Sequence, residues 1–393
     1  MIRVHLGVNK YMRILPDLSQ NPLYQAYESY NNPRLENDGA EFLTAEHIAE
    51  LKRESEIVLW DEYAKPKVAP GVGTLRRIGI RTAQGYTYDT LVGIPEQPEC
   101  AIPVIGTSAW TTSLRGHNEH VVRNLVRAGN YVLFVGSEGS YVADQEVKAA
   151  SPISLANSAA TVLNFSYHMI AELRSAGHDV DEEKRFVVGE SRGGMVGEGI
   201  DALAEEFAQD VLFSDQVAPC LPERLQSITD IVRLTEQIAK EPGEMAKLLG
   251  SLTLSRLRYY PHTIDIRLDC LKHQAAIGGA LFSGETGHLS LRTPGTTLKH
   301  LTVFDNDFAS NRSWWETRYM DNPLVRTTPL PGGHMTIADL ETLRYVLARN
   351  KTAQQFINSG SELTANVFDL SHELALRQFP ITAAVMNSYP KTA

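Results

Sequence analysis

Residues 189–193 read Gly-Glu-Ser-Arg-Gly, a G-x-S-x-G pattern that occurs once in the chain, after the apolar run Phe186-Val187-Val188. A serine between a strand and a helix sits in strained backbone, and small neighbours such as Gly189 and Gly193 permit that turn. The pattern therefore predicts an exposed Ser191 at a helix N-terminus, where N–H groups favour developing negative charge. The bare pattern also arises by chance, so the interpretation as a nucleophile depends on the strand and helix around it.

In these residues, and in the order of elements around them, the chain resembles the α/β-hydrolase superfamily over about residues 75–350. The resemblance implies a mostly parallel central sheet flanked by helices. It also implies a catalytic triad in the chain order nucleophile, acid, histidine, and carboxylic esters as substrates, as in esterases and lipases.

The downstream sequence contains the acid and the histidine that this resemblance requires. Asp305 and Asp307 follow the apolar run 300–304, and a Gly/Pro-rich loop carries His334. The imidazole would take the serine proton, and the carboxylate would hold the imidazole in place and stabilise its cation. We favour Asp307 over Asp305 because it lies further beyond the strand, where the loop turns toward the histidine. The alternative bases among the twelve histidines are His288, His117 and His120.

Acyl transfer also needs N–H donors for the oxyanion. One expected donor is the backbone N–H of Arg192, directly after the nucleophile. The second is expected from the loop at residues 106–110, with Ala109 or Trp110 favoured over Ser108. We interpret the side chains of Glu190 and Arg192 as a local ion pair rather than as catalytic groups.

A helical cap is expected at residues 221–298. About 80 residues separate two predicted strands there, far more than one crossover helix needs. Two apolar helical stripes lie on either side of Pro242-Gly243. The resemblance implies a cap over the active site, and a structural excursion or a dimer contact remains the alternative. Trp314 and Trp315 follow the acid, and core packing is favoured for them over a place in the pocket.

The remaining elements predict the layers of the fold. Residues 75–82 and 86–94 are typical of a β-hairpin. Further strand-like and helix-like runs alternate after it, and such alternation predicts right-handed crossovers and a parallel sheet. The strand-like runs are 102–105, 131–135, 185–188 and 210–214, and the helix-like runs are 118–128, 154–176 and 194–207.

The predicted domain organisation places the hydrolase core at residues 75–220 and 299–350, on either side of the cap. Residues 1–74 are expected to form an irregular, polar N-terminal segment with one helix after Thr44. Residues 351–393 are expected to be a C-terminal helical extension.

Composition narrows the class of protein further. The 37 Lys and Arg against 47 Asp and Glu give a net charge of −10, without a basic stripe, which argues against nucleic acid as a partner. No apolar run is long enough to span a membrane, and the first residues do not read as a secretion signal, so we expect a cytoplasmic protein. Three scattered cysteines and the absence of nucleotide or metal motifs predict no disulfide framework, no cofactor and no metal.

Together these features predict a capped α/β-hydrolase with an added N-terminal segment that hydrolyses a small-molecule ester through an acyl-enzyme. A peptidase, thioesterase or acyltransferase on the same scaffold is the first alternative, and a non-catalytic ligand-binding protein is the second. Ser191 at the turn disfavours the aspartate nucleophiles of related hydrolases. A homodimer remains open.

Overall fold

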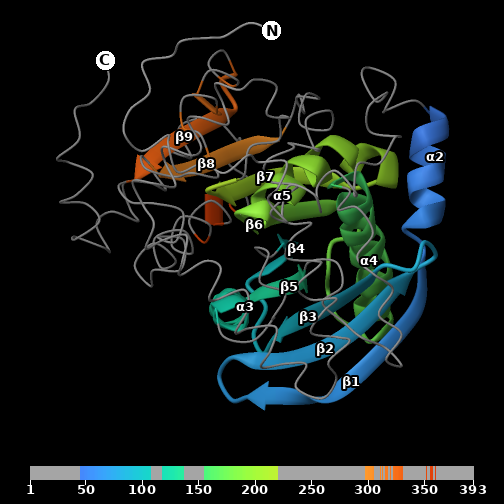
Figure 1. Ribbon diagram of the computed structural model, residues 1–393. Helices are drawn as coiled ribbons and strands as arrows, with labels where there is room; N and C mark the ends of the chain where they lie inside the picture. The colour runs from blue at the N-terminus through green and yellow to red at the C-terminus, as the bar shows by residue number, and fades with distance from the viewer. Residues whose placement is uncertain are drawn as a thin grey trace, which may run out of the picture.

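A twisted sheet forms the centre of the described structure in the computed structural model. The structure describes residues 45–107, 117–136, 155–219, 297–304 and 322–330, and a few separate residues within 310–319 and 351–359. Within these residues nine strands hydrogen-bond in the order β1-β2-β3-β5-β4-β6-β7-β8-β9 (Figure 1). The strands are β1 (Ile57–Ala69), β2 (Gly73–Thr82), β3 (Thr87–Pro95), β4 (Cys100–Thr107), β5 (Asn130–Val135), β6 (Lys184–Glu190), β7 (Asp210–Val217), β8 (Leu298–Phe304) and β9 (Val325–Leu330).

The sheet has an antiparallel end and a parallel end. β1 pairs with β2, β2 with β3, and β3 with β5, and each of these pairs is antiparallel. From β5 to β9 every neighbouring pair is parallel. The predicted hairpin and the mostly parallel sheet are therefore confirmed.

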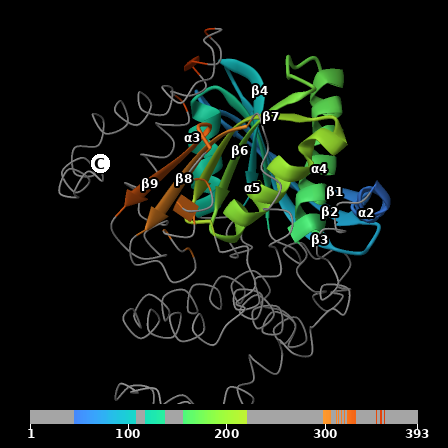
Figure 2. The ribbon, with the colours of Figure 1, turned by 90° about the horizontal axis from the view of Figure 1, so that it is seen from above.

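Helices cover both faces of the sheet. α3 (His117–Arg127) lies on one face, and α4 (Leu155–Ser175) and α5 (Arg192–Leu203) lie on the other (Figures 1 and 2). α2 (Ala45–Glu54) packs beside α4 through Leu51, and a short 3-10 helix, Ala204–Phe207, continues from α5.

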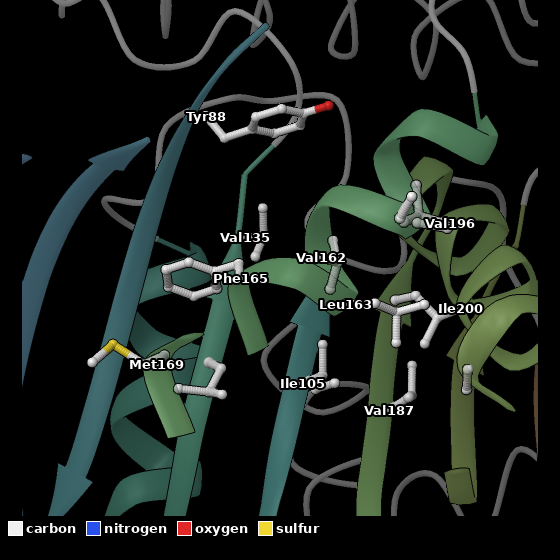
Figure 3. Packing of buried hydrophobic residues seen from close by; sticks show 14 of the residues in the cluster. Tyr88, Ile105, Val135, Val162, Leu163, Phe165, Met169, Val187, Val196 and Ile200 are labelled. Carbon is white, nitrogen blue, oxygen red and sulfur yellow. The ribbon is translucent and has the colours of Figure 1, made fainter. Parts of the chain in front are cut away.

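Two apolar clusters form the core because successive strand residues point to opposite faces. Ile105 and Val187 pack with α4 and α5, as the close view in Figure 3 shows. Their neighbours Val104 and Phe186 pack with α3 on the other face. Each large apolar side chain buried in this way contributes about 1.5–3 kcal/mol to stability. This packing holds α5, and with it the turn at Ser191, firmly on the sheet.

The strand β1 corrects one expectation. Residues 57–69 lie within the predicted irregular N-terminal segment, yet they form the edge strand of the sheet. The predicted helix after Thr44 is present as α2, but it ends at Glu54. Residues 1–44 of the N-terminal segment, residues 221–296 of the predicted cap and most of the C-terminal extension lie outside the described residues.

Candidate active site

The backbone at Ser191 is strained. Ser191 joins β6 to α5 with φ 56° and ψ −121°, whereas L-residues strongly prefer negative φ. Among the described residues, only Ala208 and Ala218 share a positive φ without being glycine. A conformation of this kind costs of order 1–3 kcal/mol and is kept where the surrounding structure enforces it. Strain at this point is typical of a functional residue.

Glycines permit this turn because the chain comes close to itself there. A Cβ at Gly189 would lie 2.4 Å from the carbonyl oxygen of Gly193, which belongs to the first turn of α5. At Gly197 an added Cβ would lie 2.1 Å from the side-chain nitrogen of Gln216 in β7. Gly189 therefore needs hydrogen in place of a side chain, as the sequence pattern predicts, because its close contact is with backbone. At Gly197 the close atoms all belong to the end of the Gln216 side chain, which would have to shift.

Neighbouring elements anchor the turn with hydrogen bonds. The backbone N–H of Ser191 donates to the carbonyl of Val217 at the end of β7, at 2.9 Å. The guanidinium of Arg192 donates to the hydroxyl of Ser158 in α4, at 3.0 Å. As the first residue of α5, Arg192 directs its backbone N–H to the helix N-terminus, where anions bind.

The serine is less open than the sequence suggests. Ser191 is 5% exposed, so the expectation of an exposed residue is wrong. The reason is that β6 from Arg185 onward and every residue of α5 are themselves buried.

The parallel register brings four strand ends to the same edge of the sheet. Glu190 pairs with Val217, and Val217 pairs with Thr302 of β8. Phe304 at the end of β8 pairs with Leu330 at the end of β9. The chain thus leaves β8 and β9 at the edge where β6 leads into Ser191.

Most other predicted site residues lie outside the described residues. These are Asp305, Asp307, His334, His288, Ser108, Ala109 and Trp110. Of the alternative histidines, His120 is exposed on α3, and His117 begins that helix. The structure therefore describes Ser191 and Arg192 of the predicted site, and the other assignments stay predictions.

A buried ionic cluster behind the turn was not predicted. Lys299 in β8 places its ammonium 2.7 Å from Glu198 Oε2 and 3.0 Å from Asp201 Oδ2. Tyr319 donates its hydroxyl to the same Glu198 oxygen at 2.5 Å. Both acidic residues belong to α5, so the cluster joins the helix that begins after Ser191 to β8. In the sequence, the cluster is indicated only by the position of Lys299 beside the apolar run of β8. That position does not identify Glu198 and Asp201, about 100 residues earlier in the chain, as its partners.

Burial changes the pKa values of this cluster. Burial raises the pKa of Asp201 from 3.8 to about 6, against the opposing charge of Lys299. Burial alone would lower the pKa of Lys299, but Glu198, Tyr319 and Asp201 outweigh it and hold that pKa well above its usual value. Lys299 is therefore a permanent cation inside the protein.

Trp315 belongs to the core, as the sequence favoured. Its side chain is fully buried and stacks on Tyr319 with ring centroids 6.2 Å apart. Its indole N–H lies 3.2 Å from the carbonyl of Pro219 and 3.2 Å from the hydroxyl of Ser310. Trp314 lies outside the described residues.

Among the described residues, no helix is both long and apolar enough to cross a bilayer. No three His, Cys, Asp or Glu side chains in this part of the chain gather as metal ligands would.

The chain was compared with known proteins in three ways. No family model matches it, and no curated protein matches it in sequence. Among solved structures it is similar to a protein from Legionella pneumophila described as a "putative hydrolase", at 13% identity and TM-score 0.50, over 82% of this chain and 97% of that one.

Two further solved structures align less closely. An esterase from Pyrobaculum calidifontis aligns at 14% identity and TM-score 0.45, over 85% of this chain and 92% of that one. A hydrolase from Pseudomonas aeruginosa aligns at 14% identity and TM-score 0.40, over 68% of this chain and 94% of that one. With its strand order, its crossover helices and the Legionella likeness, the described part of this chain has the α/β-hydrolase fold.

Proposed function

We propose that this protein is a serine hydrolase that cleaves carboxylic esters through an acyl-enzyme intermediate, with Ser191 as the nucleophile. The observation that carries the proposal is the backbone of Ser191, held at φ 56° between β6 and the N-terminus of α5. The turn presents the hydroxyl beside helix N–H groups that stabilise negative charge.

The proposed mechanism has two steps. Ser191 attacks the ester carbonyl while His334 takes its proton, and the N–H of Arg192 with a second donor at Ala109 or Trp110 stabilises the oxyanion. His334 then protonates the leaving alcohol. In the second step His334 takes a proton from a water that attacks the acyl-enzyme and gives it to Ser191 as the carboxylic acid leaves. Asp307, or Asp305 in its place, orients the histidine ring throughout and stabilises its cation when it forms.

Chain length permits His334 to reach the serine. β9 lies three strand spacings from β6, which is about 14 Å across the sheet. His334 follows Leu330 by four residues, and four extended residues span up to about 14 Å before the side chain is counted. The candidate acids follow β8, one strand closer, so both groups start from the edge where Ser191 lies.

Esters are proposed because the turn resembles that of esterases and lipases. An oxyanion hole and a triad would act in the same way on a thioester or an amide, so the leaving group must be determined by assay. The first test compares wild type and S191A on p-nitrophenyl esters of increasing acyl length, with matched thioester and peptide substrates. The proposal expects ester hydrolysis by wild type, a loss of at least about 10³-fold in S191A, and weaker activity on the other substrates.

The result that overturns the proposal is equal activity of wild type and S191A, or a folded wild type that hydrolyses none of the esters. Circular dichroism and thermal unfolding of both proteins show that the comparison is made on folded chains. Preference for thioesters or peptides with the same loss in S191A would keep the serine mechanism and change the substrate class.

A further inference from the structure

Thr107 connects the turn at Ser191 to a different part of the sheet. It is the last residue of β4 and is buried. Its hydroxyl donates to the carbonyl of Gly193 at 2.6 Å, two residues beyond the proposed nucleophile. The carbonyl of Val188 in the adjacent strand lies farther away, at 3.4 Å. The strong bond therefore goes to the first turn of α5 rather than to the neighbouring strand.

The surroundings leave little freedom to this contact. Thr107 pairs with Gly189 in the ladder between β4 and β6. The Gly193 carbonyl lies so close to Gly189 that a Cβ there would be 2.4 Å away. The hydroxyl of Thr107, the backbone of Gly189 and the carbonyl of Gly193 thus form one packed contact between the residues that flank the strained serine.

The place of Thr107 in the chain gives this contact a second consequence. The next residue, Ser108, belongs to the loop predicted at residues 106–110, from which the second oxyanion donor, Ala109 or Trp110, is expected. The first two residues of that predicted loop are the last two of β4. The first donor, Arg192 N–H, lies in the turn that Thr107 contacts. Thr107 therefore contacts the turn that carries the first donor and directly precedes the segment expected to carry the second. Both N–H groups can bind one oxyanion only if the distance between them is right.

We propose that Thr107 is a positioning residue of the oxyanion hole, which holds the first turn of α5 against the end of β4 through the Gly193 carbonyl. This inference deepens the proposed function and rests on it for its catalytic consequence. The hydrogen bond makes no contact with the reacting atoms, so its effect is on geometry. A displacement of about 1 Å at an active site can cost about 10²-fold in rate.

The chain offers a matched control in Thr90 of β3. Thr90 is also buried in the sheet, and its hydroxyl donates to a backbone carbonyl, that of Ile78, at 2.7 Å. The acceptor belongs to the antiparallel hairpin and not to the turn at Ser191. T107V and T90V therefore remove the same kind of bond from the same kind of site, and T107S keeps the hydroxyl at position 107.

The experiment measures two quantities on wild type, T107V, T107S and T90V. The first is hydrogen exchange of the Met195 amide, which donates to the Ser191 carbonyl at 3.3 Å. The second is kcat and KM on the best ester substrate. In T107V we expect the amide hydrogen of Met195 to exchange about tenfold faster than in wild type. We also expect kcat of T107V to fall by about 10- to 100-fold, with KM within about threefold of wild type. T107S and T90V should keep wild-type values of both.

The two measurements separate the inference from the proposed function. If T107V leaves Met195 exchange unchanged, or if T90V changes it as much, the positioning role is overturned whatever the enzyme does. If exchange accelerates in T107V alone while kcat stays within about twofold of wild type, Thr107 holds the turn but not the oxyanion hole, and the inference is again overturned. A wild type without esterase activity contradicts the proposed function, and the exchange data still decide whether Thr107 fixes the turn.

Discussion

The ammonium of Lys299 lies 2.7 Å from a carboxylate oxygen of Glu198, and both side chains are almost completely buried. Glu198 stands on α5, seven residues after Ser191, and Lys299 stands on β8, which ends just before Asp305. The pair therefore joins the element that carries the proposed nucleophile to the strand that leads to the proposed acid. An ionic contact without solvent is sensitive to the loss of either partner.

Replacing the cation should be costly. K299M leaves Glu198 and Asp201 facing each other in the interior without a counter-charge, so we expect the free energy of unfolding to fall by about 3–5 kcal/mol. Urea unfolding measures this loss. The control K184M removes an exposed lysine at the start of β6 and should stay within about 0.5 kcal/mol of wild type. A K299M protein as stable as K184M would show that the buried cluster contributes nothing to folding.

The same cluster predicts how stability depends on pH. Because the pKa of Asp201 is about 6 in the folded chain and ordinarily 3.8, the folded state binds a proton more tightly than the unfolded state. Its stabilising contribution is therefore complete below about pH 4 and is lost as the pH rises through about 6, a change of about 2–3 kcal/mol.

Chemical unfolding of wild type and D201N between pH 4 and pH 8 measures this contribution as the difference between the two curves. D201N should show the flatter profile, and D210N, at an exposed position, should follow wild type. If the wild-type and D201N profiles run parallel across this range, Asp201 does not titrate as described.

The central strands could be predicted from the sequence, and the edge strands could not. β5 has all six residues buried, and the run Tyr131–Val135 within it is continuously apolar, which is typical of a strand covered on both faces. β1 contains Pro66 and several charges and has no buried residue, while β9 contains Pro329 and alternates only weakly. Edge strands tolerate charges and proline because one side of the ladder is unpaired, and this removes the pattern used for prediction.

The site divides in a similar way. The strained turn at Ser191 and the need for Gly189 could be predicted because the turn is local and its steric demands appear in five consecutive residues. The contacts of Thr107 and Lys299 could not, since their partners Gly193, Glu198 and Asp201 lie about 90 to 100 residues away in the chain. A single sequence carries no record of such distant pairs.

The glycine before the nucleophile provides another prediction. G189A places a methyl group against the Gly193 carbonyl, so the first turn of α5 must move. We expect a loss of about 100-fold or more in kcat and of about 1–3 kcal/mol in stability, measured by ester hydrolysis and urea unfolding.

The control for this substitution is G177A, at the end of α4. Gly177 has φ +90°, and an added Cβ there would meet no atom within 4 Å, so alanine should cost about 1–2 kcal/mol through backbone strain alone. Its kcat should equal that of wild type. Unchanged activity in G189A would mean that the close approach at the turn is not needed for catalysis.

The central claim is that the hydroxyl of Ser191 is an activated nucleophile, and covalent labelling with a fluorophosphonate tests it most directly. The folded protein is incubated with the probe and digested, and the adduct is located by mass spectrometry, with S175A as a control that removes an exposed serine hydroxyl at the end of α4. The account predicts one adduct per chain, on Ser191, present in wild type and S175A and absent in S191A. An adduct on a different serine, or a folded wild type that takes up no probe, would contradict it.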